Sequence, residues 1–255
     1  MTDPTQRFSS RVENYIKFRP GYPPAVLELL ARKCGLTGTS VVADVGSGTG
    51  ILTGLLLQSG GRIFAVEPNR EMREAAEKLL GGNPNFTSVT GSAETTWLPD
   101  RSMDVITAGQ AFHWFDRARM RPEFLRILKP GGWVVLIWND RNITAHPFFR
   151  AYEQLLLTFG TDYAAVNHKN VDEQVLGSFF GPKGYGSASF PNDQTFDFDG
   201  LKGRLLSSSY APEPGDPRHV PMLEALESLF QTYQTHGKVT FDYDTTVFYG
   251  RLSAG

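Results

Sequence analysis

The residues whose types and spacing point most directly to chemistry form a glycine-rich stretch, Asp44-Val45-Gly46-Ser47-Gly48-Thr49-Gly50, which follows a β-branched run. Glycines in a turn between a strand and a helix let a ligand approach the backbone closely. Glu67 ends the next apolar run, about 20 residues further on, where a carboxylate can accept hydrogen bonds from both ribose hydroxyls. The pattern predicts a bound nucleoside, although an ordinary tight turn would also account for the glycines alone.

Two classes of cofactor use such a turn, and the spacing separates them. The dinucleotide pattern G-x-G-x-x-G would need a glycine at position 51, where this chain has Ile51, and Gly50 instead gives G-x-G-x-G. Asp44, just before the turn, would repel a pyrophosphate but suits a ligand with an ammonium group. Both points favour S-adenosylmethionine (SAM), and they argue against the rival interpretation of an NAD(P)-dependent oxidoreductase.

Two further residues are candidates for chemistry on a substrate. His113 lies a few residues beyond an apolar run at 103–108, where substrate would enter, so it is the candidate general base. Packing against Trp114 is its alternative role. Arg19 is the candidate for binding a carboxylate, because a guanidinium offers two parallel donors, and clamping the N-terminal segment to the sheet is its alternative role. Four aromatic residues are expected in the substrate pocket, with one of the last two in the core instead: Tyr15, Tyr22, Phe112 and Trp114.

The elements that must position these residues alternate between strand and helix. Apolar runs predict strands at 40–45, 62–66, 86–89, 103–108 and 133–138. Helices are predicted at 24–34, 51–57, 69–80 and 122–128, the last ending at Lys129-Pro130-Gly131-Gly132. This alternation predicts a mostly parallel sheet with helices on both faces.

The last hundred residues show a different pattern. Apolar residues at helical spacing predict helices at 148–159 and 222–233, and strands are predicted at 187–196 and 238–249. A glycine-rich stretch at 177–186 and a proline-rich loop at 211–221 separate them. We interpret this region as the end of the same sheet plus inserted helices that form a lid, with a separate second domain as the alternative.

Composition limits the classes of protein that fit. The chain has 255 residues, and 25 basic against 27 acidic side chains give a net charge of −2, which disfavours nucleic acid as a partner. Cys34 is the single cysteine and the histidines show no metal-ligand spacing, so no metal is expected. The first residues are polar and no apolar run approaches the roughly 18 residues of a membrane span, so we expect a cytoplasmic protein without membrane contact.

Five ordered motifs carry a resemblance to a known family. Asp44–Gly50, Ala65–Asn69, Gly91–Glu94, Met103–Ile106 and Leu128–Gly132 resemble the motifs of class I SAM-dependent methyltransferases. Ala111–Asp116 and Tyr15–Pro23 resemble the trans-aconitate methyltransferase-like group of methyltransferase type 11 proteins. The resemblance implies an α/β, Rossmann-like fold with a mostly parallel seven-stranded sheet and a helical lid. It implies one domain over 1–255, with the cofactor core at 38–140, an N-terminal lid at 1–37, and sheet completion plus substrate lid at 141–255.

The resemblance also implies roles for individual residues. Gly46, Ser47, Gly48 and Gly50 would pass under the methionine part of SAM, with Asp44 on its ammonium and Gln110 facing the same end. Glu67 would bind the ribose hydroxyls, with Pro68 and Asn69 beside the adenine, and Ser92, Ala93 and Glu94 would approach the adenine edge. Ser92 departs from the family pattern, because many relatives have an aspartate there, and a hydroxyl accepts more weakly than a carboxylate.

The expected function is methyl transfer from SAM, with S-adenosylhomocysteine as the by-product, to a small molecule. O-methylation of a carboxylate or hydroxyl is preferred, by a monomer or homodimer. C-methylation of a quinone-like ring and a non-catalytic SAM-binding module are the alternatives. No Asn/Asp-Pro-Pro-Tyr/Phe motif for an extruded base is present in the sequence.

Overall fold

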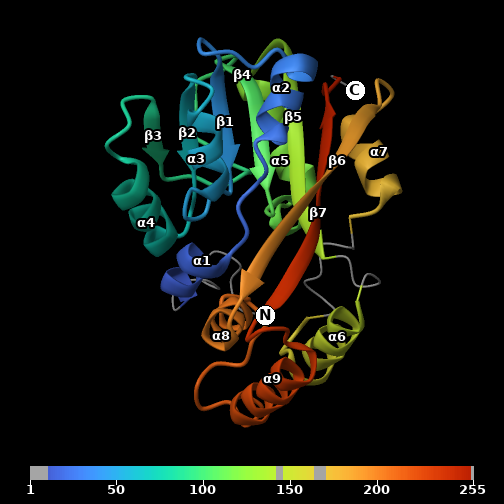
Figure 1. Cartoon of the computed structure of the whole chain (residues 1–255). Helices are drawn as coiled ribbons and strands as arrows, with labels where there is room; N and C mark the ends of the chain where they lie inside the picture. The colour runs from blue at the N-terminus through green and yellow to red at the C-terminus, as the bar shows by residue number, and fades with distance from the viewer. Residues whose placement is uncertain (1–10, 142–145, 164–170, 254–255) are drawn as a thin grey trace.

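A twisted sheet forms the centre of the molecule. The computed structural model describes residues 11–141, 146–163 and 171–253, so the polar start of the chain lies outside the described residues. Within them a seven-stranded sheet has the order β3-β2-β1-β4-β5-β7-β6. All neighbouring strands are parallel except β7, which is antiparallel to both β5 and β6. The strands are β1 Val41–Val45, β2 Arg62–Val66, β3 Phe86–Val89, β4 Met103–Gly109, β5 Leu128–Arg141, β6 Tyr185–Phe196 and β7 Val239–Gly250. The expected mostly parallel, seven-stranded α/β sheet is confirmed (Figure 1).

Helices cover both faces of this sheet. Side chains of the central strands alternate between the faces, so Ala43 and Val45 pack with α5 and α7 while Val42 packs with α2 and α3. These four strand-packing helices are α2 Ala25–Cys34, α3 Ile51–Leu57, α5 Arg117–Ile127 and α7 Glu173–Phe180. Helix α4, Arg70–Leu80, begins within one residue of the expected position. Asn69 caps it, and the Asn69 side chain accepts from Met72 N at 2.9 Å.

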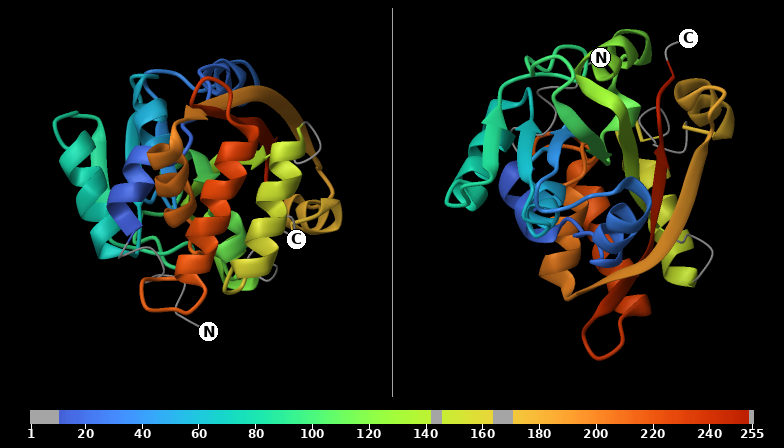
Figure 2. Two further views of the ribbon diagram at one scale, coloured as in Figure 1. Left: turned by 60° about the horizontal axis from the view of Figure 1, so that its bottom comes forward. Right: turned by 90° about the horizontal axis from the view of Figure 1, so that it is seen from above.

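The remaining helices gather at one end of the sheet. They are α1 Val12–Phe18, α6 Pro147–Phe159, α8 Phe198–Leu206 and α9 His219–Tyr233, called the lid helices below. The arrowheads of β1 and β4 point toward them, and β6 and β7 extend to meet them (Figure 1). Seen from that end, α1, α8, α9 and α6 lie side by side (Figure 2, left). Their shared core is aromatic, with the ring of Phe241 packed against Phe148, Phe149 and Tyr152.

Several predicted boundaries are wrong, for identifiable reasons. Helix α5 begins at Arg117 instead of 122, because the Asp116 side chain accepts from two backbone N–H groups of its first turn. Strand β5 begins at once at Leu128, so the stop signal at 129–132 lies inside the strand, with Gly131 in the left-handed region at φ 81°. Helix α7 runs through Gly177, where a glycine-rich connection is predicted, since Asp172 caps its N-terminus.

Two lid helices were not predicted, and a third begins earlier than expected. Helices α1 and α8 have no counterpart in the sequence analysis, and α9 begins at His219 instead of 222. Pro221 is therefore in the first turn of α9, where proline costs no intrahelical hydrogen bond. None of the helices in the described part of the chain is long and apolar enough to cross a membrane.

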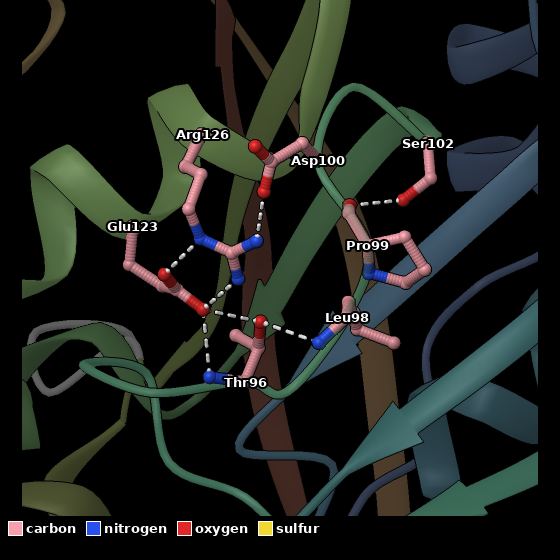
Figure 3. A network of polar contacts seen from close by, with 7 residues as sticks. All are labelled: Thr96, Leu98, Pro99, Asp100, Ser102, Glu123 and Arg126. Carbon is pink, nitrogen blue, oxygen red and sulfur yellow. Dashed lines mark hydrogen bonds and ion pairs between the residues drawn. The ribbon is translucent and has the colours of Figure 1, made fainter.

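A polar network ties the loop between β3 and β4 to α5 (Figure 3). The Glu123 carboxylate accepts from the backbone N–H and hydroxyl of Thr96, at 2.8 and 2.6 Å, and binds the Arg126 guanidinium, which also pairs with Asp100. Burial raises the pKa of Glu123, but hydrogen bonds from Arg126 and Thr96 outweigh it and hold the pKa at about 2. The network fixes the chain just after the stretch 92–94, which is predicted to contact the cofactor.

Candidate active site

Two adjoining cavities open at the carboxyl ends of β1 and β4, where the strand order reverses. This is where open α/β sheets bind ligands. The Glu67 cavity is lined by Glu67, Pro68, Asn69, Met72, Ser92, Ala93, Glu94, Ala111 and Phe115. The Arg204 cavity holds about 1080 Å³, including the part open to solvent. Its lining includes Arg19, Tyr22, Asp44, Ser47, His113, Asn139, Arg141, Tyr163, Arg204 and Tyr210. The cavities share Tyr15, Gly46, Gly48, Gly109, Gln110 and Trp114, so they are continuous.

The glycine turn between β1 and α3 forms part of the wall between the cavities. Gly46, Gly48 and Gly50 have φ of 68°, 57° and 84°, a region that favours glycine. Gly46 and Gly48 line both cavities, whereas Gly50 lines neither. A Cβ on Gly50 would lie 2.7 Å from the Leu80 side chain, so this glycine serves the packing of α3 against α4. Packing thus accounts for Gly50, and its contact with a cofactor stays a prediction.

Glu67 is buried and holds the turn in place. Its Oε2 accepts from Gly48 N at 2.9 Å and its Oε1 accepts from Asn69 N at 2.8 Å. Burial raises the pKa of Glu67, and the two backbone hydrogen bonds oppose that rise. An ionised carboxylate has about four acceptor positions, so two remain for hydroxyls of a ligand.

Asp44 is fully buried at the wall of the Arg204 cavity. Its carboxylate oxygens accept from the hydroxyls of Thr53, at 2.6 Å, and Thr107, at 2.9 Å. Burial raises the pKa of Asp44 to about 6, against the two threonine hydrogen bonds that lower it. Asp44 is therefore a carboxylate whose charge a nearby cation would stabilise.

Residues after β3 and β4 close the space between the turn and the lid. Ser92, Ala93 and Glu94 line the Glu67 cavity, and Glu94 also accepts from Asp116 N at 2.8 Å. Gln110 lies in the left-handed region at φ 56° and donates its backbone N–H to Ile137 O at 2.8 Å. Such strain in a residue other than glycine is typical of functional sites. A Cβ on Gly109 would lie 2.6 Å from the Tyr22 hydroxyl, so Tyr22 fits only over a glycine.

The predicted substrate residues divide between cavity and core. His113 and Trp114 line the Arg204 cavity, with ring centroids 4.9 Å apart. Phe112 lies in the core instead, completely buried, with its ring centroid 4.9 Å from that of Phe179. Phe112 is therefore the one of the two aromatic residues that serves the core, because the 3-10 turn at 112–114 points its side chain toward α7.

The N-terminal segment reaches the cavity through its contacts with α8. Arg11 donates to Ser208 O at 2.6 Å and to Ala211 O at 2.7 Å, and Arg19 donates to Ser207 O at 2.9 Å. The Arg19 guanidinium lies over the Tyr15 ring at 4.8 Å from its centroid. Arg19 thus clamps the chain and also lines the cavity, and its binding of a carboxylate stays a prediction.

Sequence reasoning missed the lid half of the site. Asn139, Arg141, Tyr163, Arg204 and Tyr210 line the Arg204 cavity from β5, α8 and the loops beside them. Asn139 and Arg141 lie in β5 just after its apolar run at 133–138, which is a signal that could have placed them at the ligand edge. No such signal exists for Arg204, because its helix was not predicted.

Comparison with known proteins agrees with this geometry. Residues 43–136 match a family model described as a methyltransferase domain. An uncharacterized methyltransferase of Mycobacterium tuberculosis is 38% identical over 140 residues, 55% of this chain and 55% of that protein. Trans-aconitate 2-methyltransferase of an Azoarcus species is 33% identical over 133 residues, 51% of this chain and 50% of that protein. The matches thus span about half the length of these relatives.

A solved structure extends the likeness to the whole fold. A candidate type II methyltransferase from Anaeromyxobacter dehalogenans superposes with a TM-score of 0.66 and 24% identity, covering 93% of this chain and 100% of that one. The strand order, the matched domain and the motifs together show that the chain carries a class I methyltransferase domain.

Proposed function

We propose that this protein transfers a methyl group from SAM to an oxygen atom of a small acidic molecule. The observation that carries the proposal is the continuity of the two cavities. A buried carboxylate suited to a ribose lies in one, and a histidine and arginines lie in the other. The methyl group would be presented where the cavities meet, beside Gly109 and Gln110.

The residues present fit SAM. Glu67 keeps two acceptor positions for the ribose hydroxyls, and Asp44 offers a negative charge to the ammonium of the methionine part. The Ser47 hydroxyl is buried and has no hydrogen-bond partner among the residues that the structure describes, so it is available to the same part of the ligand. Ser92, Ala93 and Glu94 line the place left for the adenine.

The protein contributes orientation and charge placement to the reaction. SAM supplies an activated methyl group, and the displacement requires the accepting atom to lie in line with the bond that breaks. A carboxylate acceptor is already ionised at pH 7 and needs no base, whereas an alcohol or phenol would need one. His113 would take that second role and Arg19 would orient a carboxylate, and their place in the lining of the Arg204 cavity supports both roles.

The arginines in the Arg204 cavity favour an acidic acceptor over a quinone-like ring. A neutral aromatic ring would leave the charges of Arg19 and Arg204 desolvated without compensation. Trans-aconitate 2-methyltransferase, a relative over half its length, is named for a carboxylic acid, which supports the same choice.

Calorimetric titration of the purified protein with SAM, S-adenosylhomocysteine and NAD⁺ tests the cofactor. We expect the first two to bind in the micromolar range and NAD⁺ not to bind. A screen of small carboxylic acids for methyl ester formation then tests the reaction. Binding of NAD⁺ alone would overturn the proposal, and binding of SAM without turnover on any acid would support a non-catalytic SAM-binding module.

A further inference from the structure

The Arg204 cavity collects three guanidinium groups from separate parts of the chain. Arg19 follows α1, Arg141 ends β5 and Arg204 lies on α8. Arg204 is only 5% exposed and the Arg141 side chain 12% exposed. Arginine keeps its proton even when buried, so three positive charges lie in one largely desolvated space.

A carboxylate compensates one of these three charges. Arg141 lies 3.2 Å from Glu153 and donates to the Tyr163 hydroxyl at 2.7 Å, and that hydroxyl in turn donates to Glu153. The Glu153–Tyr163 pair therefore both neutralises and orients the Arg141 guanidinium. Its Nη1 nevertheless remains buried without a hydrogen-bond partner among the described residues.

Among the residues that the structure describes, Arg19 and Arg204 have neutral partners instead. Arg204 donates to the Tyr243 hydroxyl at 3.2 Å and to Ser208 Oγ at 3.3 Å, and Arg19 donates to Ser207 O. Arg19 Nε is buried with no hydrogen-bond partner in the part of the chain that the structure describes. Buried charges are normally paired, so two guanidiniums with neutral partners indicate that a ligand supplies the counter-charge.

Tyr210 lies among the three guanidiniums. Burial raises the pKa of its phenol, but Arg141, Arg204 and Arg19, with a smaller contribution from Ser208, outweigh burial and lower it. Burial lowers the pKa of Arg19, and repulsion from Arg204 adds to that effect. The three positive charges therefore act on one small region and repel one another.

The charge of SAM does not remove this excess. Its ammonium and carboxylate cancel, and its sulfonium adds one positive charge, while Asp44 contributes one negative charge to the same cavity. Arg19 and Arg204 then leave an excess of two positive charges. An acceptor with two negative charges would balance it.

We propose that the methyl acceptor carries two anionic groups, one a carboxylate that receives the methyl group and the other an anion held by Arg141 and Arg204. This inference rests on the proposed function. One oxygen of the reacting carboxylate forms the new O–C bond as the methyl–sulfur bond breaks, and the electron pair of that bond goes to sulfur. No proton moves, and the product keeps the second anionic group on the arginines.

Calorimetry on the unmodified protein saturated with S-adenosylhomocysteine tests the inference without relying on turnover. The probes are pairs of equal carbon number at matched ionic strength: succinate and butanoate, glutarate and pentanoate, adipate and hexanoate. We expect at least one dicarboxylate to bind about tenfold or more tightly than its partner, because a second charged contact is made. Equal affinity within every pair, or no binding, would overturn the inference. 3-Phosphonopropionate identifies the second anion, since binding tighter than that of succinate indicates a phosphate-like group.

Variants then locate the second anion. Arg204→Met should lose about tenfold or more of the affinity for the preferred dianion while the affinity for S-adenosylhomocysteine stays within about twofold. Arg150→Met removes an exposed arginine of α6 and is the matched control, with no loss expected. Retained dianion affinity in Arg204→Met would overturn the assignment, and Arg204→Lys tests it further if the methionine variant does not fold. If S-adenosylhomocysteine does not bind the unmodified protein, the proposed function fails, and titration of the same pairs without it still tests the anion site.

Discussion

Replacing Glu67 by alanine is the most informative single perturbation of this site. The change removes a charged acceptor from two backbone N–H groups, those of Gly48 at 2.9 Å and Asn69 at 2.8 Å. Each such bond is worth about 1.5–3 kcal/mol. Burial of the carboxylate, which raises its pKa, offsets part of that sum. We therefore expect a net loss of about 1–3 kcal/mol in the free energy of unfolding.

The same change should weaken SAM binding by a further, separate amount. If both ribose hydroxyls donate to Glu67, their loss costs about 1–3 kcal/mol, which is about 5- to 150-fold in Kd. Titration calorimetry measures the Kd, and urea denaturation measures the stability. Glu67→Gln keeps the shape but turns an amide N–H toward one of the two backbone donors, so it should fall between alanine and the natural residue.

The two measurements together distinguish a ligand contact from a structural role. Glu28→Ala, an exposed change on α2, is the control and should alter neither quantity. A Glu67→Ala protein that loses stability but binds SAM within about twofold of the natural protein would refute the ribose assignment. In that case Glu67 would only shape the glycine turn.

Three further predictions concern the neighbouring residues. The Asp44 carboxyl has its pKa raised to about 6 by burial, against 3.8 in the unfolded chain, so the native state binds a proton that the unfolded state does not. The Asp44 carboxyl should therefore add about 3 kcal/mol to the free energy of unfolding as pH falls from about 6 to about 4, which urea denaturation measures as the difference in slope between the natural protein and Asp44→Asn. His113→Ala should slow steady-state turnover of hydroxyl acceptors by about 10²–10⁴-fold and leave SAM affinity unchanged, whereas collapse of SAM affinity would make His113 a cofactor contact. Gly109→Ala should cost about 1–3 kcal/mol in denaturation experiments, because its Cβ would lie 2.6 Å from the Tyr22 hydroxyl, while Gly82→Ala, with open space around it, should not.

The cofactor half of the site could be predicted because its signals are local. The glycine turn, Glu67 and the stretch 92–94 each lie directly after a strand, and parallel strands bring their carboxyl ends to one edge. Alternating apolar patterns determine the strands, so residues that follow them are placed together without knowledge of distant contacts. The sequence could not decide which of Phe112 and Trp114 lies in the core, because an aromatic residue beside a site can serve packing instead.

The lid half depends on contacts between distant parts of the chain. Helix α8 contains Gly200 and Gly203, which weaken its local helical signal, and Gly203 is needed because a Cβ there would overlap the Phe18 ring. That contact between α1 and α8 has no trace in either local sequence.

The sequence alone was enough to predict the sheet and the glycine turn, and to favour SAM over a dinucleotide as the expected cofactor, since strand periodicity and turn chemistry act over a few residues. Only the tertiary structure brought Arg19, Arg141 and Arg204 to one cavity. Each arginine follows or lies in a different element, and the electrostatic excess that they create exists only once the lid helices have packed against β6 and β7.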